Sequence, residues 1–278
     1  ARFLVISDLN AKATNATIFK AIELQRTQIE TYLKDQIETY EAVTWNDEQE
    51  RVEVRKISRL GAIVLKEIQV ANSEDSEVTA VLLDELEDLG LEVLNWSKEA
   101  KALKDRVNFV NQHSLNFPDF SDDYLLENME EWLAPYLAGI STLRVCQNLD
   151  LHSILLGQLS YEQTQKLDML APAKLKVASG SKIAIDYSNW AQPVLAVRLQ
   201  EMFGTKSTPT VLNGKVKLMI HLLSPASRPM QVTQDLENFW KNTYDEVKKE
   251  LRGKYKKHYW PDDPLTAQAT SKTKKNRV

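Results

Sequence analysis

The chain of 278 residues is 43% hydrophobic and 27% charged, and it carries a net charge of −4. This composition is ordinary for a soluble globular protein, and the length suffices for one large domain or for two to three small ones. No apolar run approaches the roughly 20 residues that span a bilayer, and a single cysteine excludes an internal disulfide framework. These features predict a cytoplasmic protein with no membrane partner.

Residues 1–71 have the pattern of a β-rich module. The apolar run at residues 2–6 predicts a strand that begins abruptly, so we expect this module to be truncated at its start. Helical spacing of isoleucines and leucines predicts one or two helices between residues 14 and 40. Alternation on both sides of a polar tip at residues 46–49 predicts a hairpin, and residues 62–70 predict a further strand. Together these elements predict part of an OB-like β-barrel.

One side of this module is predicted to be positively charged, because it carries the four cations Arg51, Arg55, Lys56 and Arg59. Nucleic-acid contact is one interpretation of such a set. Long charged side chains on strands more commonly form a solvated face. We therefore favour the solvated face.

Residues 72–171 are predicted to be mostly helical. The apolar stripe of the first helix consists of Val81, Leu82, Leu86 and Leu89. Ser97 is placed to cap a second helix over residues 97–111, and a third is predicted over residues 121–133. This segment is the helical module of the chain.

Beyond Pro172 the pattern becomes β-like. Short runs at residues 175–178, 183–187, 195–199 and 217–223 predict strands, and Asn213-Gly214 is a strong turn signal. One long amphipathic helix is predicted to follow, with Thr233 as its cap and Gly253 as its stop. Its buried stripe is predicted to contain Leu236, Phe239, Trp240, Tyr244, Val247 and Leu251.

The predicted fold class is therefore α+β, arranged in several modules. The partial OB-like β-barrel comprises residues 1–71 and the mostly helical section residues 72–171. Residues 172–264 are expected to form a carboxy-terminal domain in which the long amphipathic helix packs on a small β-sheet. Residues 265–278 are small, polar and basic, and we expect a flexible tail.

A search for catalytic chemistry yields no site. Gly214-Lys215 is the nearest approach to a phosphate-binding P-loop, and it fails because Pro209 and Val216 replace the required glycine and hydroxyl residues. Cys146 lies in a helical segment and is interpreted as a buried thiol rather than a nucleophile. The four histidines have no metal-ligand spacing. We therefore predict no catalytic residue, no metal site and no cofactor within this chain.

The carboxy-terminal end is strongly basic although the whole chain is acidic. Residues 241–278 contain eleven Lys plus Arg and five Asp plus Glu, a net charge of +6, which leaves −10 for residues 1–240. Cations can neutralise phosphates and aromatic rings can stack on bases, so single-stranded RNA or DNA is a candidate partner. The predicted contact residues are Lys249, Arg252, Lys254, Lys256, Lys257, Tyr259 and Trp260. In the alternative interpretation the aromatic residues fasten the segment to the domain and the lysines face water.

Several motifs in this region occur together in one family. They are residues 180–204 (GSKIAIDYSNWAQPVLAVRLQEMFG), residues 223–226 (LSPA), Arg228-Pro229, Phe239-Trp240 and residues 260–264 (WPDDP). In this order they resemble the carboxy-terminal region of the bacterial HrpB-type DEAH-box ATP-dependent helicases. The resemblance covers nearly the whole chain and weakens before about residue 40.

The resemblance implies a parent protein whose motor consists of two RecA-like domains, with the P-loop and DEAH box that bind ATP and Mg²⁺. Winged-helix, ratchet and OB-like modules follow in that family. Because none of the motor motifs occurs here, the chain is interpreted as an accessory fragment that does not hydrolyse ATP. Its expected role is to help bind or position single-stranded nucleic acid. The alternative is a protein-interaction module whose acidic helical section docks the parent's motor domains or another protein.

Overall fold

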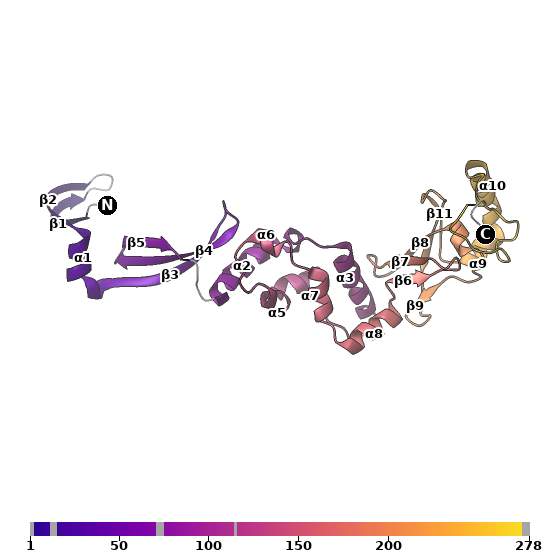
Figure 1. Cartoon of the computed structure of the whole chain (residues 1–278), viewed down its shortest axis with the longest axis horizontal. Helices are drawn as coiled ribbons and strands as arrows, with labels where there is room; N and C mark the ends of the chain where they lie inside the picture. Colours follow the sequence, from indigo (N-terminus) through magenta and orange to yellow (C-terminus); the bar gives the residue numbers. More distant parts are fainter. Residues whose placement is uncertain (1–2, 12–15, 71–74, 114–115, 274–278) are drawn as a thin grey trace. The chain divides into compact units, whose positions relative to one another are not determined.

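The computed structural model describes residues 3–11, 16–70, 75–113 and 116–273 (Figure 1). The chain forms two compact units. The first unit combines Ala1–Val93 with Leu133–Asn148, and the second combines Leu94–Trp132 with Leu149–Val278. Both helices and several small sheets are present, so the predicted α+β class is confirmed.

Strands dominate the first unit. Its elements before residue 70 are β1 (Phe3–Ala11), β2 (Ala16–Leu24), α1 (Arg26–Tyr32), η1 (Lys34–Gln36), β3 (Ile37–Asn46), β4 (Arg51–Leu60) and β5 (Ile63–Gln69). β1 and β2 form an antiparallel ribbon, and β3, β4 and β5 form an antiparallel sheet in chain order. The hairpin predicted around residues 46–49 and the strand predicted after it are thus confirmed.

Of the one or two helices predicted between residues 14 and 40, one is present, but strands occupy most of the segment. Of the described residues in that segment, 26–32 are α-helical, whereas 16–24 and 37–40 are strands; residues 14 and 15 lie outside the described ranges. Ile18 and Ile22 are four residues apart, a spacing that fits both one helix face and alternate positions on one side of a strand. The β-branched side chains favour the strand.

The predicted OB-like barrel is not confirmed. Among the described residues, β1 and β2 pair with each other alone, β3 to β5 form an open sheet, and no closed barrel is present. The alternation of apolar and polar residues along the chain predicts which side chains lie on each face of a strand. Closure depends instead on hydrogen bonds between the first and last strands, which the alternation does not encode.

A helix covers the three-stranded sheet of the first unit. Helix α2 (Asp75–Leu89) packs against β3 and β4, and η2 (Leu91–Val93) follows it. Leu82 and Leu86 are fully buried as predicted, whereas Leu89 is 44% exposed and does not belong to the buried stripe.

The chain returns to this unit with η3 (Ala134–Tyr136) and α6 (Leu143–Cys146). The backbone N–H groups of Val52 and Leu143 donate to the carbonyls of Ser141 and Glu50, at 2.8 and 3.0 Å. These bonds fasten residues 141–143 to the start of β4.

The first part of the second unit is helical. They are α3 (Lys98–Asn111), α4 (Asp122–Glu127), α5 (Met129–Trp132), α7 (Leu151–Gly157) and α8 (Tyr161–Leu170). The predicted Ser97 cap is confirmed, because the Ser97 hydroxyl accepts from the Ala100 N–H at 3.0 Å. The helix predicted over residues 121–133 is interrupted at Asn128, where the backbone leaves the helical region.

A five-stranded sheet follows in the order β12-β11-β8-β7-β6, beside the two-stranded β9–β10 sheet. The strands are β6 (Lys174–Lys176), β7 (Lys182–Asp186), β8 (Val194–Arg198), β9 (Thr210–Val211), β10 (Val216–Lys217), β11 (Met219–Leu223) and β12 (Pro229–Thr233), with η4 (Leu199–Met202) after β8. β8 and β11 are parallel and the other neighbours antiparallel. Leu195 and Ile220 pair in the sheet and are fully buried, so the core lies at these central strands.

The long amphipathic helix is in fact two helices, α9 (Leu236–Asn242) and α10 (Tyr244–Lys254), that meet at Thr243. Asp235, rather than Thr233, caps α9 by accepting from the Asn238 N–H at 3.0 Å. Gly253 lies inside α10, which ends one residue later. The predicted apolar stripe is correct, because Leu236, Phe239, Trp240, Tyr244, Val247 and Leu251 are all buried.

Candidate nucleic-acid interface

The side of α10 that faces solvent carries charges of both signs, from the exposed residues Asp245, Glu246, Lys249, Glu250 and Arg252. Tyr244, Val247 and Leu251 are buried, and at 3.6 residues per turn Lys249 and Arg252 lie on the opposite side of the helix. Both side chains are exposed. The sequence folds this way because apolar residues recur every three to four positions and leave the cations outside.

The predicted cations differ in their pairing. Lys254 contacts Glu250 at 2.7 Å. Over the described part of the chain, Lys249, Arg252, Lys256 and Lys257 form no ion pair; we call these four residues the unpaired cations. No carboxylate lies within ion-pair distance of them, so they can pair with an anion in solution, although the charge of Lys249 also acts on the neighbouring Asp245.

The two predicted aromatic contact residues are placed differently from the cations. Trp260 is 9% exposed, and its indole N–H donates to the Tyr255 carbonyl at 3.2 Å. Tyr259 is half-buried, and its carbonyl accepts from the Gln200 side-chain amide at 2.9 Å. A buried indole presents no free face to a base, so Trp260 braces the domain in this conformation.

Gln200 holds the segment after α10 against η4. Its side-chain oxygen lies 2.8 Å from Nδ1 of His258, and its backbone carbonyl accepts from the Thr270 N–H at 3.0 Å. Burial, and secondarily the charge of Arg198, lowers the pKa of His258. Burial therefore favours the neutral ring, and a proton on Nδ1 lets that nitrogen donate to the Gln200 oxygen.

The Trp-Pro-Asp-Asp-Pro segment is also structural. The hydroxyl of Tyr244 donates to the Pro261 carbonyl at 2.9 Å, and the Gly204 N–H donates to the Pro264 carbonyl at 2.9 Å. Asp262 accepts from Lys248 at 3.3 Å. The carboxylate of Asp263 accepts from the N–H of Leu265, the main reason that its pKa lies below its usual range. These contacts fix the path of the chain across the sheet domain.

The segment predicted to be a flexible tail begins with residues that contact the carboxy-terminal domain. Ala267 packs close to Gly204, since a Cβ added at Gly204 would lie 3.5 Å from the Ala267 carbonyl oxygen. The Thr270 N–H donates to the Gln200 carbonyl at 3.0 Å. Residues 265–270 are therefore attached to the domain. Residues 274–278 fall outside the described ranges.

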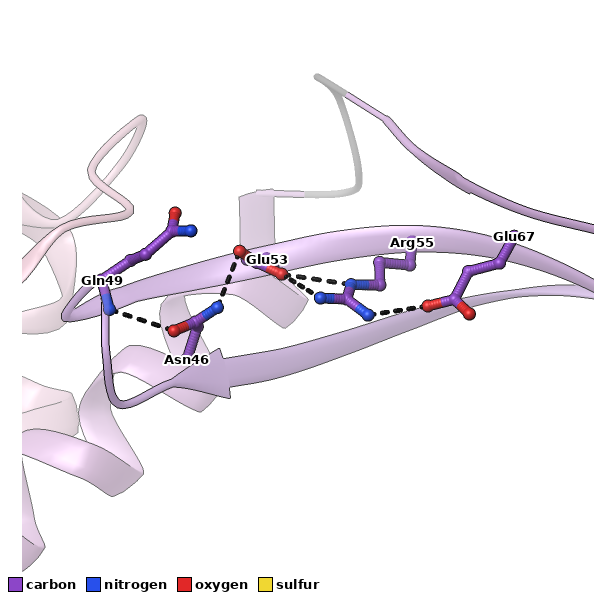
Figure 2. A network of polar contacts seen from close by, with 5 residues as sticks. All are labelled: Asn46, Gln49, Glu53, Arg55 and Glu67. Carbon is purple, nitrogen blue, oxygen red and sulfur yellow. Dashed lines mark hydrogen bonds and ion pairs between the residues drawn. The ribbon is translucent and has the colours of Figure 1, made fainter.

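Two of the four cations on the positive side of the first unit, Arg55 and Arg59, are paired with acids, and Figure 2 shows the contacts of Arg55. Arg55 donates to Glu53 at 2.6 Å and to Glu67 at 2.7 Å, and Asn46 donates to the second oxygen of Glu53 at 2.9 Å. The hydrogen bond from Arg55 is the largest cause of the lowered pKa of Glu53. Arg59 similarly bonds Glu38 at 2.8 Å. This arrangement supports the solvated face over a phosphate-binding face.

The cysteine is a buried structural thiol, as predicted. Cys146 is 1% exposed, and desolvation raises its pKa to about 11. At neutral pH the group is therefore a thiol rather than a thiolate, and it is a poor nucleophile.

Comparisons with known proteins agree with the motifs in the sequence. Residues 132–264 match the family model described as ATP-dependent helicase C-terminal. The chain is 39% identical to the ATP-dependent RNA helicase HrpB of Escherichia coli (strain K12) over 241 residues, which are 86% of this chain. The resemblance to the carboxy-terminal region of HrpB-type helicases is confirmed.

Two crystal structures of E. coli HrpB, one described as a DExH-box NTPase and one as a DEAH/RHA helicase, resemble the fold. Their TM-scores are 0.68 and 0.61, at 35% and 33% identity over 97% and 92% of this chain. The chain spans about a third of these relatives: 30% of the curated HrpB protein, and 34% and 32% of the two structures.

The HrpB-type motifs fall largely on structural positions. Gln200 is 3% exposed and joins His258, Tyr259 and Thr270, a role that the sequence analysis missed. The available signal was the polar pair Gln200-Glu201 between the apolar residues Leu199 and Met202. Among the described residues, no helix is long and apolar enough to cross a membrane.

Proposed function

We propose that this chain is an accessory, non-motor part of an ATP-dependent RNA helicase and that its unpaired cations bind the phosphates of single-stranded nucleic acid. Lys249, Arg252, Lys256 and Lys257 are the contact residues. ATP and Mg²⁺ belong to the motor domains of the parent protein, and cytoplasm is the compartment that the single buried thiol favours. The four-module division into residues 1–71, 72–171, 172–264 and 265–278 is part of the same proposal.

The observation that supports this function is the difference in pairing among the exposed cations of this region. Lys241 and Lys254 are each held by a glutamate at 2.7 Å, whereas the unpaired cations have no such partner among the described residues. An unpaired exposed cation gains more from a phosphate than one already neutralised, because binding does not first break an existing ion pair. Tyr259 stays in the proposal as a contact at the edge of the site, and Trp260 serves to hold the segment in place.

The test is the salt dependence of binding to a labelled single-stranded RNA. The logarithm of the binding constant falls as the logarithm of the salt concentration rises, and removal of one phosphate contact decreases the magnitude of this slope by roughly one unit. We expect that decrease for Lys249→Gln and for Arg252→Gln. Lys241→Gln is the matched control, since it removes an equal but paired charge from α9, and its slope should stay near that of the parent chain. Binding without any salt dependence contradicts the proposal.

Protein docking is a second candidate function, supported by the β1–β2 ribbon. Its large apolar side chains are exposed: Leu4, Val5, Ile6, Leu9, Ile18, Phe19 and Ile22 are between 40% and 68% accessible. A two-stranded ribbon is at best marginally stable alone, so a covering surface would stabilise it. We propose the motor domains of the parent helicase as that surface.

This second proposal is tested by mixing the chain with separately purified motor domains of an HrpB-type helicase. Phe19→Asp combined with Ile22→Asp places two charges on the ribbon and should abolish the complex in sedimentation velocity. Tyr161→Asp, at a side chain that is 79% exposed on α8, is the control and should leave the complex intact. Equal complex formation by both variants contradicts docking through the ribbon.

A further inference from the structure

A small cavity lies in the second unit, between helix ends and the β9–β10 turn. Its volume is about 220 Å³, and its lining residues are His113, Lys166, Met169, Leu170, Leu212, Asn213 and Lys215. Figure 1 shows β9 beside the end of α8, where the Leu212 N–H donates to the Leu170 carbonyl at 2.8 Å. The cavity thus joins residues that are far apart in the chain, from His113 to Lys215.

The turn that forms one wall is strained. Leu212 and Asn213 have φ angles of 53° and 55°, in the left-handed region that a bulky residue such as leucine rarely adopts. The Gly214 N–H closes the turn on the Val211 carbonyl at 3.2 Å. Leu212 is 3% exposed, so packing of its side chain and its bond to Leu170 hold the turn in this conformation. Strain of this kind is maintained where surrounding structure fixes it, and it commonly marks ligand sites.

The floor and the rim of the cavity differ in chemistry. Leu170 and Leu212 are buried and give an apolar floor, beside which Met169 remains 63% exposed. The rim carries His113, Lys166 and Lys215, and no carboxylate is among the lining residues. Over the described part of the chain, neither lysine forms an ion pair. An apolar floor with a cationic rim fits a ligand that has a flat apolar part and an anionic part.

We propose that this cavity binds one nucleotide of a single-stranded nucleic acid. The base lies on Met169 and the apolar floor, where a thioether and a ring make favourable contacts, and a phosphate contacts Lys166 and Lys215. The volume is below the roughly 300 Å³ of ordinary small-molecule sites, so the cavity suits one ring system rather than a whole metabolite. The inference rests on the proposed function for its class of partner, but it concerns different residues.

The experiment follows the methyl resonance of Met169 by NMR, in the full chain with labelled methionine. The chain has five methionines, and Met169→Leu identifies the signal. Titration with adenosine monophosphate, and separately with a short single-stranded RNA, should shift this resonance in a saturable way. The double variant Lys166→Gln, Lys215→Gln should weaken that response by about tenfold or more, because two charge-assisted contacts are lost.

Controls separate this site from the unpaired cations. Lys174→Gln with Lys176→Gln removes two exposed lysines of β6 in the same unit and should leave the Met169 response unchanged. Lys249→Gln with Arg252→Gln should reduce RNA binding while adenosine monophosphate still shifts Met169. If instead those α10 variants bind RNA normally, the proposed function fails while the cavity site stands. An unmoved Met169 resonance at saturating ligand, or an equal shift with inorganic phosphate alone, overturns the cavity site.

Discussion

Replacement of Trp240 by alanine tests whether the stripe of α9 and α10 forms the core of the carboxy-terminal domain. The side chain is 6% exposed, and its ring centroid lies 4.9 Å from that of Phe239 and 5.5 Å from that of Tyr244. Its indole N–H also donates to the Thr205 carbonyl at 2.8 Å. Removal of a buried tryptophan typically costs about 3 to 5 kcal/mol, which includes the cavity that is left behind. The acceptor at Thr205 adds to this cost if water does not reach it.

The assay is urea unfolding followed by circular dichroism, with the free energy of unfolding compared between variants. Trp240→Phe keeps a ring but loses the hydrogen bond, so its cost should lie below that of alanine. Tyr161→Ala is the control, because that side chain is 79% exposed, and surface changes usually alter stability by no more than about 0.5 kcal/mol. A Trp240→Ala protein as stable as the Tyr161→Ala protein would refute the assignment of Trp240 to the core.

Three further predictions concern individual contacts. Burial and Arg198 lower the pKa of His258, so the folded state favours the neutral ring. The stability that the neutral ring contributes is complete above the unfolded pKa of about 6.5. It is lost as pH falls through the lower pKa of the folded state. Urea midpoints from pH 5 to 8 should therefore fall toward acid less steeply in His258→Gln than in the parent chain. Asp235→Ala removes the cap on the Asn238 N–H and should cost about 1 kcal/mol in the same assay, whereas Asp235→Asn should cost less. Cys146 should react with a thiol reagent much more slowly in the folded chain than in urea, since its pKa is about 11 and its side chain is buried; equal rates would contradict this assignment.

Residue patterns predict local structure well where only one geometry fits them. The stripe from Leu236 to Leu251 is buried as expected, and Ser97 caps α3 because a serine before a helical run has a defined backbone role. Ile18 and Ile22 show the limit, since a four-residue spacing suits a helix and a strand equally and the pairing of β2 with β1 decides between them. Such pairing is a long-range property. Periodicity within one segment does not contain it.

The candidate sites illustrate the same limit for function. Charge and exposure of Lys249 and Arg252 follow from helix periodicity, but the pairing of Arg55 with Glu53 and Glu67 depends on how β4 and β5 align. The cavity at Leu212 depends on contact between α8 and a turn forty residues away. No local pattern predicts either arrangement.

Three aromatic residues near the basic end take a structural role, because each has a specific partner in the domain. Tyr244 bonds the Pro261 carbonyl, Trp240 bonds the Thr205 carbonyl, and Trp260 bonds the Tyr255 carbonyl. Each bond satisfies the polar atom of a buried ring, which would otherwise lose its hydrogen bond to water. A stacking role for Trp260 would require this anchor to break, at a cost that adds to the binding free energy. The unpaired cations carry no such cost, so a nucleic acid that binds here gains most from its phosphates, and its affinity should depend on salt far more than on sequence.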